Sequence, residues 1–488
     1  MRERPTIRLD KIARSAAVKY GFRPEFPPGV TSETSMMHER VYPGLPGDTT
    51  DMRELPWSSI DNWDSEDLDQ LEYCDVVGGG EIRVRVAVAD VDMYVRKESE
   101  TDLHAAHNGT SVYTGVVTFP LLPDRLSKGI TSLLPGHDRM AMVVEYRVLP
   151  DGSIRPGGIQ RALVLNKAKL VYEDVGDWLE GNAPEPAGIT AVPGMETQVR
   201  LQSSTAQKMR KHRMDQGALD LETIEARPVM EGNQVTELAV QKPNLARSII
   251  EEFMVAANAT MVHLLGIHEI PMIQRVVRVP KNWDAIVAVA AGYDARLPAG
   301  PDAPALSGFL ASRKDADPER FPDLSLTIIK LLGPGEYLPL NPGDPPYGHF
   351  SMAITDYTHG TAPNRRYVDI INQRLLKSAL DKAPTPYSPV DLARHSAWLT
   401  DREKAEKKVE RFMVKAAAAV LLRDRIGEIF DGLVTGVKDT GCYARIISPP
   451  VEGRVMRGEK GLRLGQNIRV RLLKTDPYNG YIDFERVL

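Results

Sequence analysis

The sequence contains very little cysteine. Only Cys74 and Cys442 occur among its 488 residues, far apart and without a CxxC spacing. This scarcity argues against a disulfide framework or a thiolate zinc site and favours a reducing cytoplasm. A long hydrophobic run is also missing, and no apolar segment that could form a signal peptide follows the charged start MRERPTIRLDK. We therefore expect a cytoplasmic protein with no membrane partner.

The net charge is small as well. At −5 for the whole chain, it gives no sign of nucleic-acid binding. The distribution is uneven, however: residues 51–75 hold nine acidic residues against one arginine, and residues 361–426 hold fourteen Lys/Arg against eight Asp/Glu. An acidic pocket with a basic flank suits a metal-dependent enzyme that acts on a polyanion. Ordinary charge fluctuation on solvated faces is the alternative.

Length and composition are those of a soluble globular protein. With 42% hydrophobic and 26% charged residues over this length, two to four domains are expected. Apolar spacing predicts helices near residues 9–17, 199–218, 249–266 and 389–425, and strands over 81–95 and on both sides of the PDGS turn at 150–153. After residue 426 the residue pattern changes to short predicted strands separated by glycines, which indicates a domain boundary.

The last sixty residues are typical of a small β-barrel. Five short strands split by glycine turns suit an OB-type fold, and their order resembles the S1 RNA-binding domain. Tyr443, Phe430 and Arg445 would then offer stacking surfaces and a phosphate partner for single-stranded RNA. Phe430 as a core residue and Tyr443 as a simple rim aromatic are the alternatives.

The most unusual stretch is SSIDNWDSEDLDQLEY, residues 58–73. Its carboxylates repel one another and need a counterion, and oxygen ligands select hard cations such as Mg²⁺ or Mn²⁺. A bound divalent ion would polarise a phosphodiester and generate hydroxide near neutral pH. Taken alone, such a loop is more often surface decoration than a metal site.

Two further motifs favour a metal site over a surface loop for this stretch. In THGTAPNRRYVDIINQRLL, Arg365 follows a constrained turn next to a helix and could stabilise charge that develops on a phosphate. Arg366 could bind RNA or form a structural ion pair with Asp369. In IIEEFMVAAN, Glu251 and Asn258 lie seven residues apart on one helix face, where they could contact a ligand or form buried hydrogen bonds.

Together these motifs resemble the RNase II (RNB) family of 3′→5′ exoribonucleases over most of the chain. The segment VYTGVVTFPLLPDRL resembles the part of that family that carries a clamping tyrosine, here Tyr113. The resemblance implies processive, Mg²⁺-dependent hydrolysis of single-stranded RNA from the 3′ end, with release of nucleoside 5′-monophosphates. Mn²⁺ would be a substitute for Mg²⁺.

The resemblance also implies a role for each motif residue. Asp61, Asp67 and, through its amide oxygen, Gln70 would hold the metal, while Asp69, Asp67 and Arg365 would be catalytic. Tyr113 would stack on the terminal nucleotides. The RNA contacts implied by the family motifs and by the barrel are Tyr113, Glu251, Arg366, Tyr443 and Arg445.

Three departures from the family pattern stand out. Gln70 replaces the usual fourth aspartate, so metal affinity should fall; Asp64 and Glu66, at no family metal position, are expected bystanders. Ala362 and Asn364 replace a hydroxyl and a hydrophobic side chain in the arginine motif. About 55 residues before the first motif are too few for the paired cold-shock domains of the family, so a more open entrance is expected.

We therefore expect an α+β multidomain monomer. Residues 1–50 would form a helical element of helix-turn-helix kind, 51–385 an RNB catalytic domain with a mixed sheet surrounded by helices, 386–426 a helical extension, and 427–488 an S1-type OB barrel. The alternative is a catalytically weakened RNA-binding protein of the same fold, disabled by Gln70. A metal-dependent nuclease acting on DNA or small nucleotides is a third reading.

Overall fold

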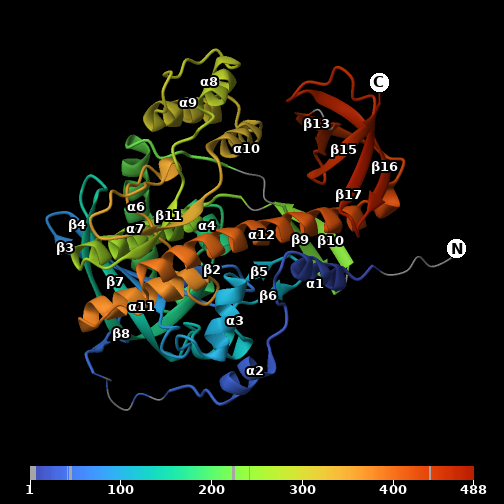
Figure 1. Cartoon of the computed structure of the whole chain (residues 1–488). Coiled ribbons are helices and arrows are strands. Elements are labelled where there is room, and N and C mark those ends of the chain that lie inside the picture. The colour runs from blue at the N-terminus through green and yellow to red at the C-terminus, as the bar shows by residue number, and fades with distance from the viewer. Residues whose placement is uncertain are drawn as a thin grey trace.

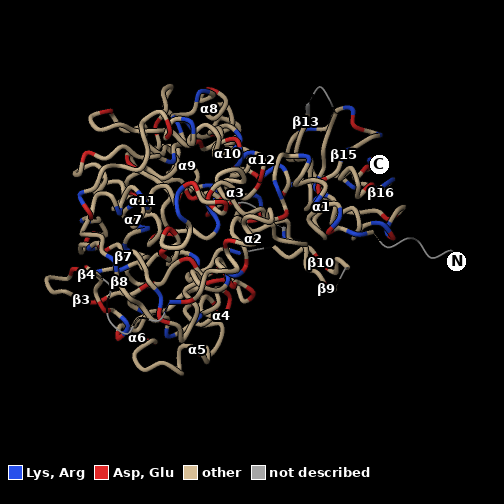
Figure 2. Tube along the Cα trace, turned by 60° about the horizontal axis from the view of Figure 1, so that its bottom comes forward, with Lys and Arg blue, Asp and Glu red and all other residues tan. Residues whose placement is uncertain are grey.

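The architecture is a large α+β body joined to a small β-barrel, as Figure 1 shows. The computed structural model describes residues 7–40, 42, 45, 47–222, 226–232, 234–240, 242–438 and 441–487. The α+β class predicted from the sequence is confirmed. Lys/Arg and Asp/Glu positions are intermingled over both the body and the barrel (Figure 2), so charge is balanced locally.

One curved, six-stranded sheet forms the centre of the body. Its order is β1-β8-β2-β3-β4-β7, and β8 also pairs with β7, so the long β8 bridges the two sides of the sheet. β8 is parallel to β1 and β2 but antiparallel to β7. The strands are β1 (Thr50–Asp51), β2 (Trp57–Asp61), β3 (Gln70–Gly78), β4 (Glu81–Ala89), β7 (Asp138–Val148) and β8 (Ile154–Val171).

The predicted strand over 81–95 is present but shorter than its apolar pattern. β4 ends at Ala89, and Val91 and Val95 are buried in the turns that follow. Glycines 78, 79 and 80 connect β3 to β4 with positive φ angles, which residues with a side chain rarely adopt. This tight turn sets the antiparallel pairing of the strand that begins at Gln70.

Two long helices pack against this sheet: α6 (Met195–Asp215) and α7 (Leu245–Ile267). α7 begins at Asn244, whose side chain accepts a hydrogen bond from the Arg247 N–H. Among the described residues, α7 is the one helix long and apolar enough to cross a membrane, and 72% of that window is buried within the fold. The buried core helix of a globular protein can be as long and as apolar as a helix that crosses a membrane.

Shorter elements complete the body. They are the α-helices α3 (Glu100–Asn108), α4 (Tyr172–Leu179), α5 (Ala187–Thr190) and α11 (Tyr367–Asp381), the single-turn helices η1 (Arg125–Ile130) and η2 (Phe350–Met352), and the strand pairs β5 (Val112–Tyr113) with β6 (Thr118–Phe119), β9 (Ala226–Glu231) with β10 (Gln234–Val240), and β11 (Met272–Val276) with β12 (Glu336–Leu340). α11 is buried along most of its length, which fixes the motif that precedes it.

A separate helical layer, seen in yellow in Figure 1, contains α8 (Trp283–Ala291), α9 (Ala303–Ala316) and α10 (Phe321–Leu332). These helices have a hydrophobic core of their own, centred on Trp283, Leu306 and Phe321. They lie between β11 and β12 in sequence and face the barrel.

The N-terminal residues form α1 (Leu9–Lys19) and α2 (Pro28–Ser35). Each helix packs mainly against a different partner: α1 against the C-terminal half of the body, on α12 (Pro389–Leu421), and α2 against α3. The apolar positions that predicted α1, among them Leu9, Ala13 and Ala17, are the ones that it buries.

The C-terminal residues form a closed barrel in the order β13-β14-β15-β17-β16. Its strands are β13 (Ile429–Lys438), β14 (Gly441–Ile446), β15 (Val451–Arg457), β16 (Asn467–Asp476) and β17 (Tyr481–Val487), after the short η3 (Arg423–Arg425). Ala418, Ala419 and Leu422, at the end of α12, belong to the hydrophobic core of the barrel. The predicted five-stranded barrel is therefore present, and α12 is built into it.

Candidate active site

The acidic loop lies between two strands of the central sheet. Asp61 ends β2, and Asp69 immediately precedes β3. The loop is held from behind, because Ser132 Oγ accepts from the Leu68 N–H at 3.0 Å and donates to the Glu66 carbonyl at 2.7 Å. Lys169 of β8 donates to the Trp63 carbonyl at 3.1 Å. These contacts hold the carboxylates at one edge of the sheet.

The arginine motif meets this edge from almost 300 residues further along the chain. The Asn364 N–H donates to Asp69 Oδ1 at 2.8 Å, and Arg365 Nε donates to Asp69 Oδ2 at 3.3 Å. Asp69 is 3% exposed, whereas the Arg365 side chain is 45% exposed. The carboxylate is thus fixed by the backbone of the motif, and part of the guanidinium stays open to a ligand.

The loop before Arg365 is anchored to α7. Gly360 N–H donates to Asn258 Oδ1 at 2.9 Å, and a Cβ at Gly360 would overlap the sulfur of Met261. Asn258 therefore makes the buried structural hydrogen bond that was one of the two readings of this helix face. The HGT sequence needs glycine here because the loop passes so close to the helix.

The two adjacent arginines have different environments. Arg366 is paired with Asp369 through two hydrogen bonds, Nε to Oδ2 at 2.9 Å and Nη2 to Oδ1 at 2.8 Å. Asp369 is fully buried and also accepts from the Ala362 N–H at 2.7 Å. Of the two readings for Arg366, the structural ion pair is the one these contacts support.

Tyr113 lies beside the carboxylates. It is 38% exposed, and its hydroxyl donates to Asp67 Oδ2 at 3.0 Å. The strand that carries it is tied to the arginine motif, because the Ser111 N–H donates to the Arg365 carbonyl at 2.9 Å. The structure thus brings Asp67, Asp69, Arg365 and Tyr113 to one place.

Burial favours the protonated form of two carboxyl groups at this site, those of Asp61 and Asp69. It raises the pKa of Asp61 to about 7 and that of Asp69 to about 8, the negative charge of Asp67 adds to both shifts, and the charge of Arg365 opposes them. Within the described residues, Asp61 Oδ2 is buried and has no hydrogen-bond partner. An unpaired acceptor beside two further carboxylates fits a cation, since its charge would favour the ionised forms.

The carboxylates are not, however, gathered into a finished ligand cage. In the described ranges, no group of three or more His, Cys, Asp or Glu side chains is arranged to hold a metal ion. Gln70, the predicted amide ligand, begins β3 and is 7% exposed. A cation at this edge would need water or substrate oxygens to complete its coordination.

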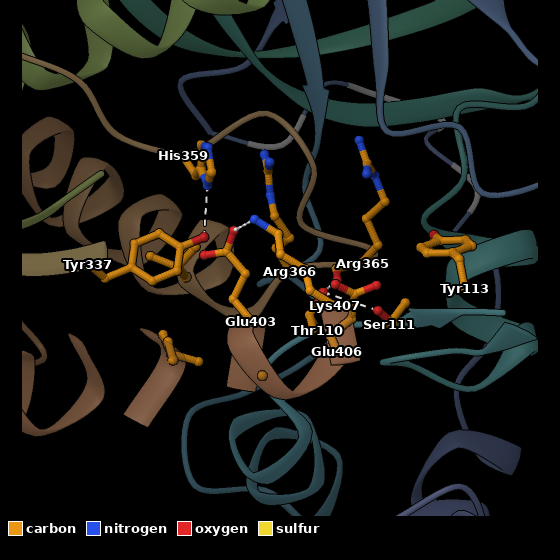
Figure 3. A pocket seen from close by; sticks show the side chains of 13 residues that line it. Thr110, Ser111, Tyr113, Tyr337, His359, Arg365, Arg366, Glu403, Glu406 and Lys407 are labelled. Atoms are coloured by element: carbon orange, nitrogen blue, oxygen red, sulfur yellow. Dashed lines mark hydrogen bonds and ion pairs between the residues drawn. The ribbon is translucent and has the colours of Figure 1, made fainter. Parts of the chain in front are cut away.

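A cavity of about 170 Å³ is lined by Tyr113, Arg365 and Arg366 (Figure 3). Arg365 and Arg366 run along it in parallel, with Tyr113 at one end and the pair formed by Tyr337 and His359 at the other. From α12, Glu403, Glu406 and Lys407 line its floor. Basic and acidic groups thus face one space large enough for part of a nucleotide.

The remaining predicted residues lie away from this centre. Glu251 is 54% exposed and paired with Arg213 of α6 at 3.1 Å. Arg445 of β14 forms an ion pair with Asp323 of α10 at 2.8 Å, with 18% of its side chain exposed, instead of standing free for RNA. Tyr443, on the same strand, is half-buried, and Phe430 is buried in the barrel core.

Sequence reasoning missed several residues. From the sequence, Asn364 is notable only because it replaces a hydrophobic residue of the family motif. In the structure its backbone N–H donates to Asp69, and its side-chain Oδ1 accepts from Thr131 Oγ1 at 2.6 Å. Glu72, fully buried on β3, went unnoticed although it belongs to the acidic stretch. An acidic residue within a β-strand, where charged side chains are uncommon, was the available signal. The expected bystanders behave as such: Asp64 is exposed, and Glu66 pairs with Lys128 at 3.1 Å.

Comparison with known proteins gives a consistent result. Residues 49–382 match the RNB domain, and residues 428–487 match the RNase II-type exonuclease C-terminal S1 domain. Ribonuclease R of Thermotoga maritima is 28% identical over 94% of this chain, which spans 68% of that protein.

Two solved structures share the fold. Mycoplasma genitalium RNase R in complex with ribose methylated single-stranded RNA superposes with a TM-score of 0.88 at 21% identity, over 98% of this chain and 78% of the other. Yeast Ssd1, a pseudonuclease, superposes with a TM-score of 0.72 at 16% identity, over 91% of this chain and 55% of the other. Since one of these is a pseudonuclease, the fold alone does not determine catalysis.

Proposed function

The chain belongs to the RNB domain family, and on that premise we propose that it is a 3′→5′ exoribonuclease. It hydrolyses single-stranded RNA processively from the 3′ end in a Mg²⁺-dependent reaction and releases nucleoside 5′-monophosphates. One observation carries the proposal: Asp69 is held by the Asn364 N–H and lies 3.3 Å from Arg365 Nε, so the carboxylate and arginine motifs form one site.

Each residue of the site would have a separate role in phosphodiester hydrolysis. A Mg²⁺ ion held by Asp61, Asp67 and the Gln70 amide oxygen would polarise the scissile phosphodiester and acidify a water molecule. Asp69, whose carboxylate is fixed by the Asn364 N–H, would take the proton of the attacking water once the charge of the bound cation favours its ionised form. The exposed face of Arg365 stabilises the negative charge that develops on the phosphate.

Tyr113 and the barrel position the substrate. The ring of Tyr113 stacks on nucleotides at the 3′ end, with its hydroxyl fixed by Asp67. Tyr443 of the barrel holds the strand further upstream. We also propose that the protein acts as a monomer in the cytoplasm, which light scattering of the purified protein and fractionation of cells would test.

The experiment uses a 5′-labelled single-stranded RNA with Mg²⁺ or Mn²⁺ and a DNA strand of the same sequence. We expect a descending ladder of RNA products that Asp69→Asn abolishes. Asp64→Asn, an exposed carboxylate of the same loop, is the matched control and should retain full activity. DNA degraded as fast as RNA would instead indicate a phosphodiesterase of broader range.

A second candidate is an RNA-binding protein with little catalysis. It is favoured by Gln70 in place of a carboxylate and by the lack of a three-residue acidic cage in the described chain. RNA binding without shortening in the same experiment would support it. Under the exonuclease proposal, Gln70→Asp should lower the Mg²⁺ concentration needed for half-maximal activity, since one more anion would face the cation.

A further inference from the structure

The helix α12 carries a row of basic side chains that the active site does not use. Its members are Lys404, Lys408, Arg411 and Lys415. They follow one another at intervals of four, three and four residues, which is the spacing of one helix face, and all four are exposed. We call this row the basic face of α12. It holds part of the positive charge that residues 361–426 show in the sequence.

Other sides of α12 are already occupied. Ala405 and Val409 pack into the hydrophobic cluster that includes α1. Glu406 and Lys407 line the cavity beside Arg365. Because Lys407 also stands at helical spacing from members of the basic face, that face continues from the wall of the cavity. Figure 1 shows α12 running from the body to the barrel, so the basic face leads from the cavity toward the barrel.

The charge of the basic face is only weakly neutralised. Lys404 lies 3.6 Å from Asp401, which is itself exposed, and Lys415 lies 3.8 Å from Glu452 of the barrel. Exposed ion pairs of this kind contribute little free energy, so both lysines can exchange partners. The two central members of the row have no ion-pair partner among the described residues. Four positive charges in a row thus face solvent, where they suit a polyanion.

Two exposed tyrosines stand where the basic face meets the barrel. Tyr478 and Tyr481, in the turn between β16 and β17, are 66% and 63% exposed. The turn is held in place by Asp476, whose Oδ1 accepts from the Tyr478 N–H at 3.1 Å. A Cβ added at Gly480 would lie 3.4 Å from the Cβ of Lys415. The turn therefore contacts α12 at the last member of the basic face.

This combination of groups has the chemistry of a site for single-stranded nucleic acid. Such sites join a positively charged track for the backbone to aromatic rings on which bases stack. The turn between the last two strands of an OB barrel is also one of the loops that bind oligonucleotides in this fold. An ordinary solvated helix face would account for the lysines, but it would not account for two exposed rings fixed beside them.

We propose that the basic face of α12 and the tyrosines of the β16–β17 turn bind the upstream part of a single-stranded RNA whose 3′ end lies at the catalytic site. Phosphates follow the basic face, and bases stack on Tyr478 and Tyr481. This surface adds a second contact of the barrel to that of Tyr443. The inference rests on the RNA substrate proposed above, but it does not depend on hydrolysis.

The first test measures RNA binding by fluorescence anisotropy in EDTA, so that no RNA is cleaved. The probes are fluorescein-labelled oligouridylates of about sixteen and about four nucleotides, and the shorter one reaches little beyond the catalytic site. The charge variant combines Lys408→Gln with Arg411→Gln. The matched control combines Lys211→Gln with Arg394→Gln, which removes two charges from other exposed helix positions.

The charge variant should bind the longer RNA about tenfold more weakly at low salt. The slope of log K against log salt should fall by about 0.7 for each lost phosphate contact, hence by about 1.4 for the pair. The control variant should bind like the wild-type protein, and the shorter RNA should bind equally well to all three proteins. A charge variant that binds the longer RNA as tightly as the control would overturn the proposal.

The tyrosines are tested together by Tyr478→Ala with Tyr481→Ala. Loss of stacking should weaken binding of the longer RNA by about fivefold or more. The salt dependence should stay as in the wild-type protein, because no charge is removed. Unchanged affinity for the longer RNA would contradict the role assigned to the turn.

Ultraviolet cross-linking of the wild-type protein to an RNA that contains 4-thiouridine does not depend on how a variant folds. Mass spectrometry of the cross-linked peptides should find RNA on the peptide that carries Tyr478 and Tyr481. Cross-links in the barrel that are confined to the peptide of Tyr443 would place the strand on another face and count against the proposal.

These outcomes are separate from those of the proposed function. A wild-type protein that binds neither RNA would contradict the proposed RNA substrate. A wild-type protein that shortens RNA, with variants that bind the longer RNA unchanged, would overturn the surface on α12 and leave the exonuclease in place. A protein that binds RNA through this surface without shortening it would have the reverse meaning.

Discussion

The edge of the central sheet and the face of the C-terminal barrel were both expected to contact RNA, and they are built differently. At the sheet edge, the Asn364 N–H holds Asp69 and the Ser111 N–H holds the Arg365 carbonyl, so both residues are positioned by backbone groups from distant parts of the chain. On the barrel, Arg445 is held by one ion pair to a neighbouring helical layer. The positions of Asp69 and Arg365 are fixed within the body itself. The position of the Arg445 side chain depends on the contact between the barrel and the helical layer.

The largest effect is expected at the sheet edge. Arg365→Ala should lower kcat by about a hundredfold to a thousandfold, because it removes a charge that acts on the transition state. Thermal stability should change little, since 45% of the side chain is exposed. Single-turnover kinetics with saturating enzyme measures the effect. A loss confined to KM would show that Arg365 only binds RNA.

The neighbouring arginine should behave in the opposite way. Arg366→Ala leaves Asp369 buried without its partner and should lower the free energy of unfolding by about 3 kcal/mol. Urea unfolding followed by circular dichroism measures this loss, with Arg365→Ala as the control. Equal stability of the two variants would contradict the different roles assigned to the two arginines.

The raised pKa values of Asp61 and Asp69 predict a pH dependence. Both groups are held protonated in the metal-free fold up to about pH 7 and pH 8, whereas the unfolded chain loses these protons near pH 4. The stability they contribute is therefore fully present below about pH 4 and is lost progressively as the pH rises from there to about 7 for Asp61 and about 8 for Asp69. Thermal unfolding of metal-free protein should show a falling Tm over that range.

Divalent cations should reverse this trend. Because Mn²⁺ binds the ionised carboxylates, its affinity should rise by about tenfold per pH unit for each carboxyl that is still protonated. Calorimetry in two buffers with different ionisation enthalpies measures the proton release. Asp69→Asn should remove part of it, and unchanged release would mean that Asp69 binds no cation and holds no proton.

The smallest effect is expected on the barrel. If Arg445 contacts RNA once its ion pair opens, Arg445→Ala should weaken RNA binding a few-fold and lower its salt dependence, while Asp323→Asn should strengthen binding by a similar factor. An ion pair of this kind contributes about 1 kcal/mol or less. Fluorescence anisotropy with labelled RNA at several salt concentrations measures both variants. Equal weakening by both would make the pair purely structural.

Much of the fold could be predicted from periodicity alone. The alternation in EIRVRVAVA and the apolar spacing of residues 9–17 report burial directly, and β4 and α1 bury those residues. The end of β4 could not be predicted, because Val91 and Val95 are buried by turns and not by strand pairing. The five-stranded barrel followed from glycine-separated strands, because each turn there needs its own glycine or polar break.

The candidate site was predictable in its residue types but not in its partners. The sequence suggested that Asp69 and Arg365 belong together only through a resemblance, since no local pattern reports a contact across 296 residues. The ion pair of Arg445 was unpredictable because Asp323 lies in another layer of the fold. Asn364 acts mainly through its backbone, which side-chain chemistry does not reveal.

The helix α12 fixes the distance between the cavity beside Arg365 and the C-terminal barrel. The 33 residues of α12 span about 50 Å; Glu403 and Lys407, near its middle, line the cavity beside Arg365, and Ala418 and Ala419, near its end, belong to the barrel core. Because α12 is packed into both parts of the molecule, it keeps them at a constant separation. If RNA binds at both places, the shortest fragment released should reflect the distance along α12 between Glu403 and Ala418.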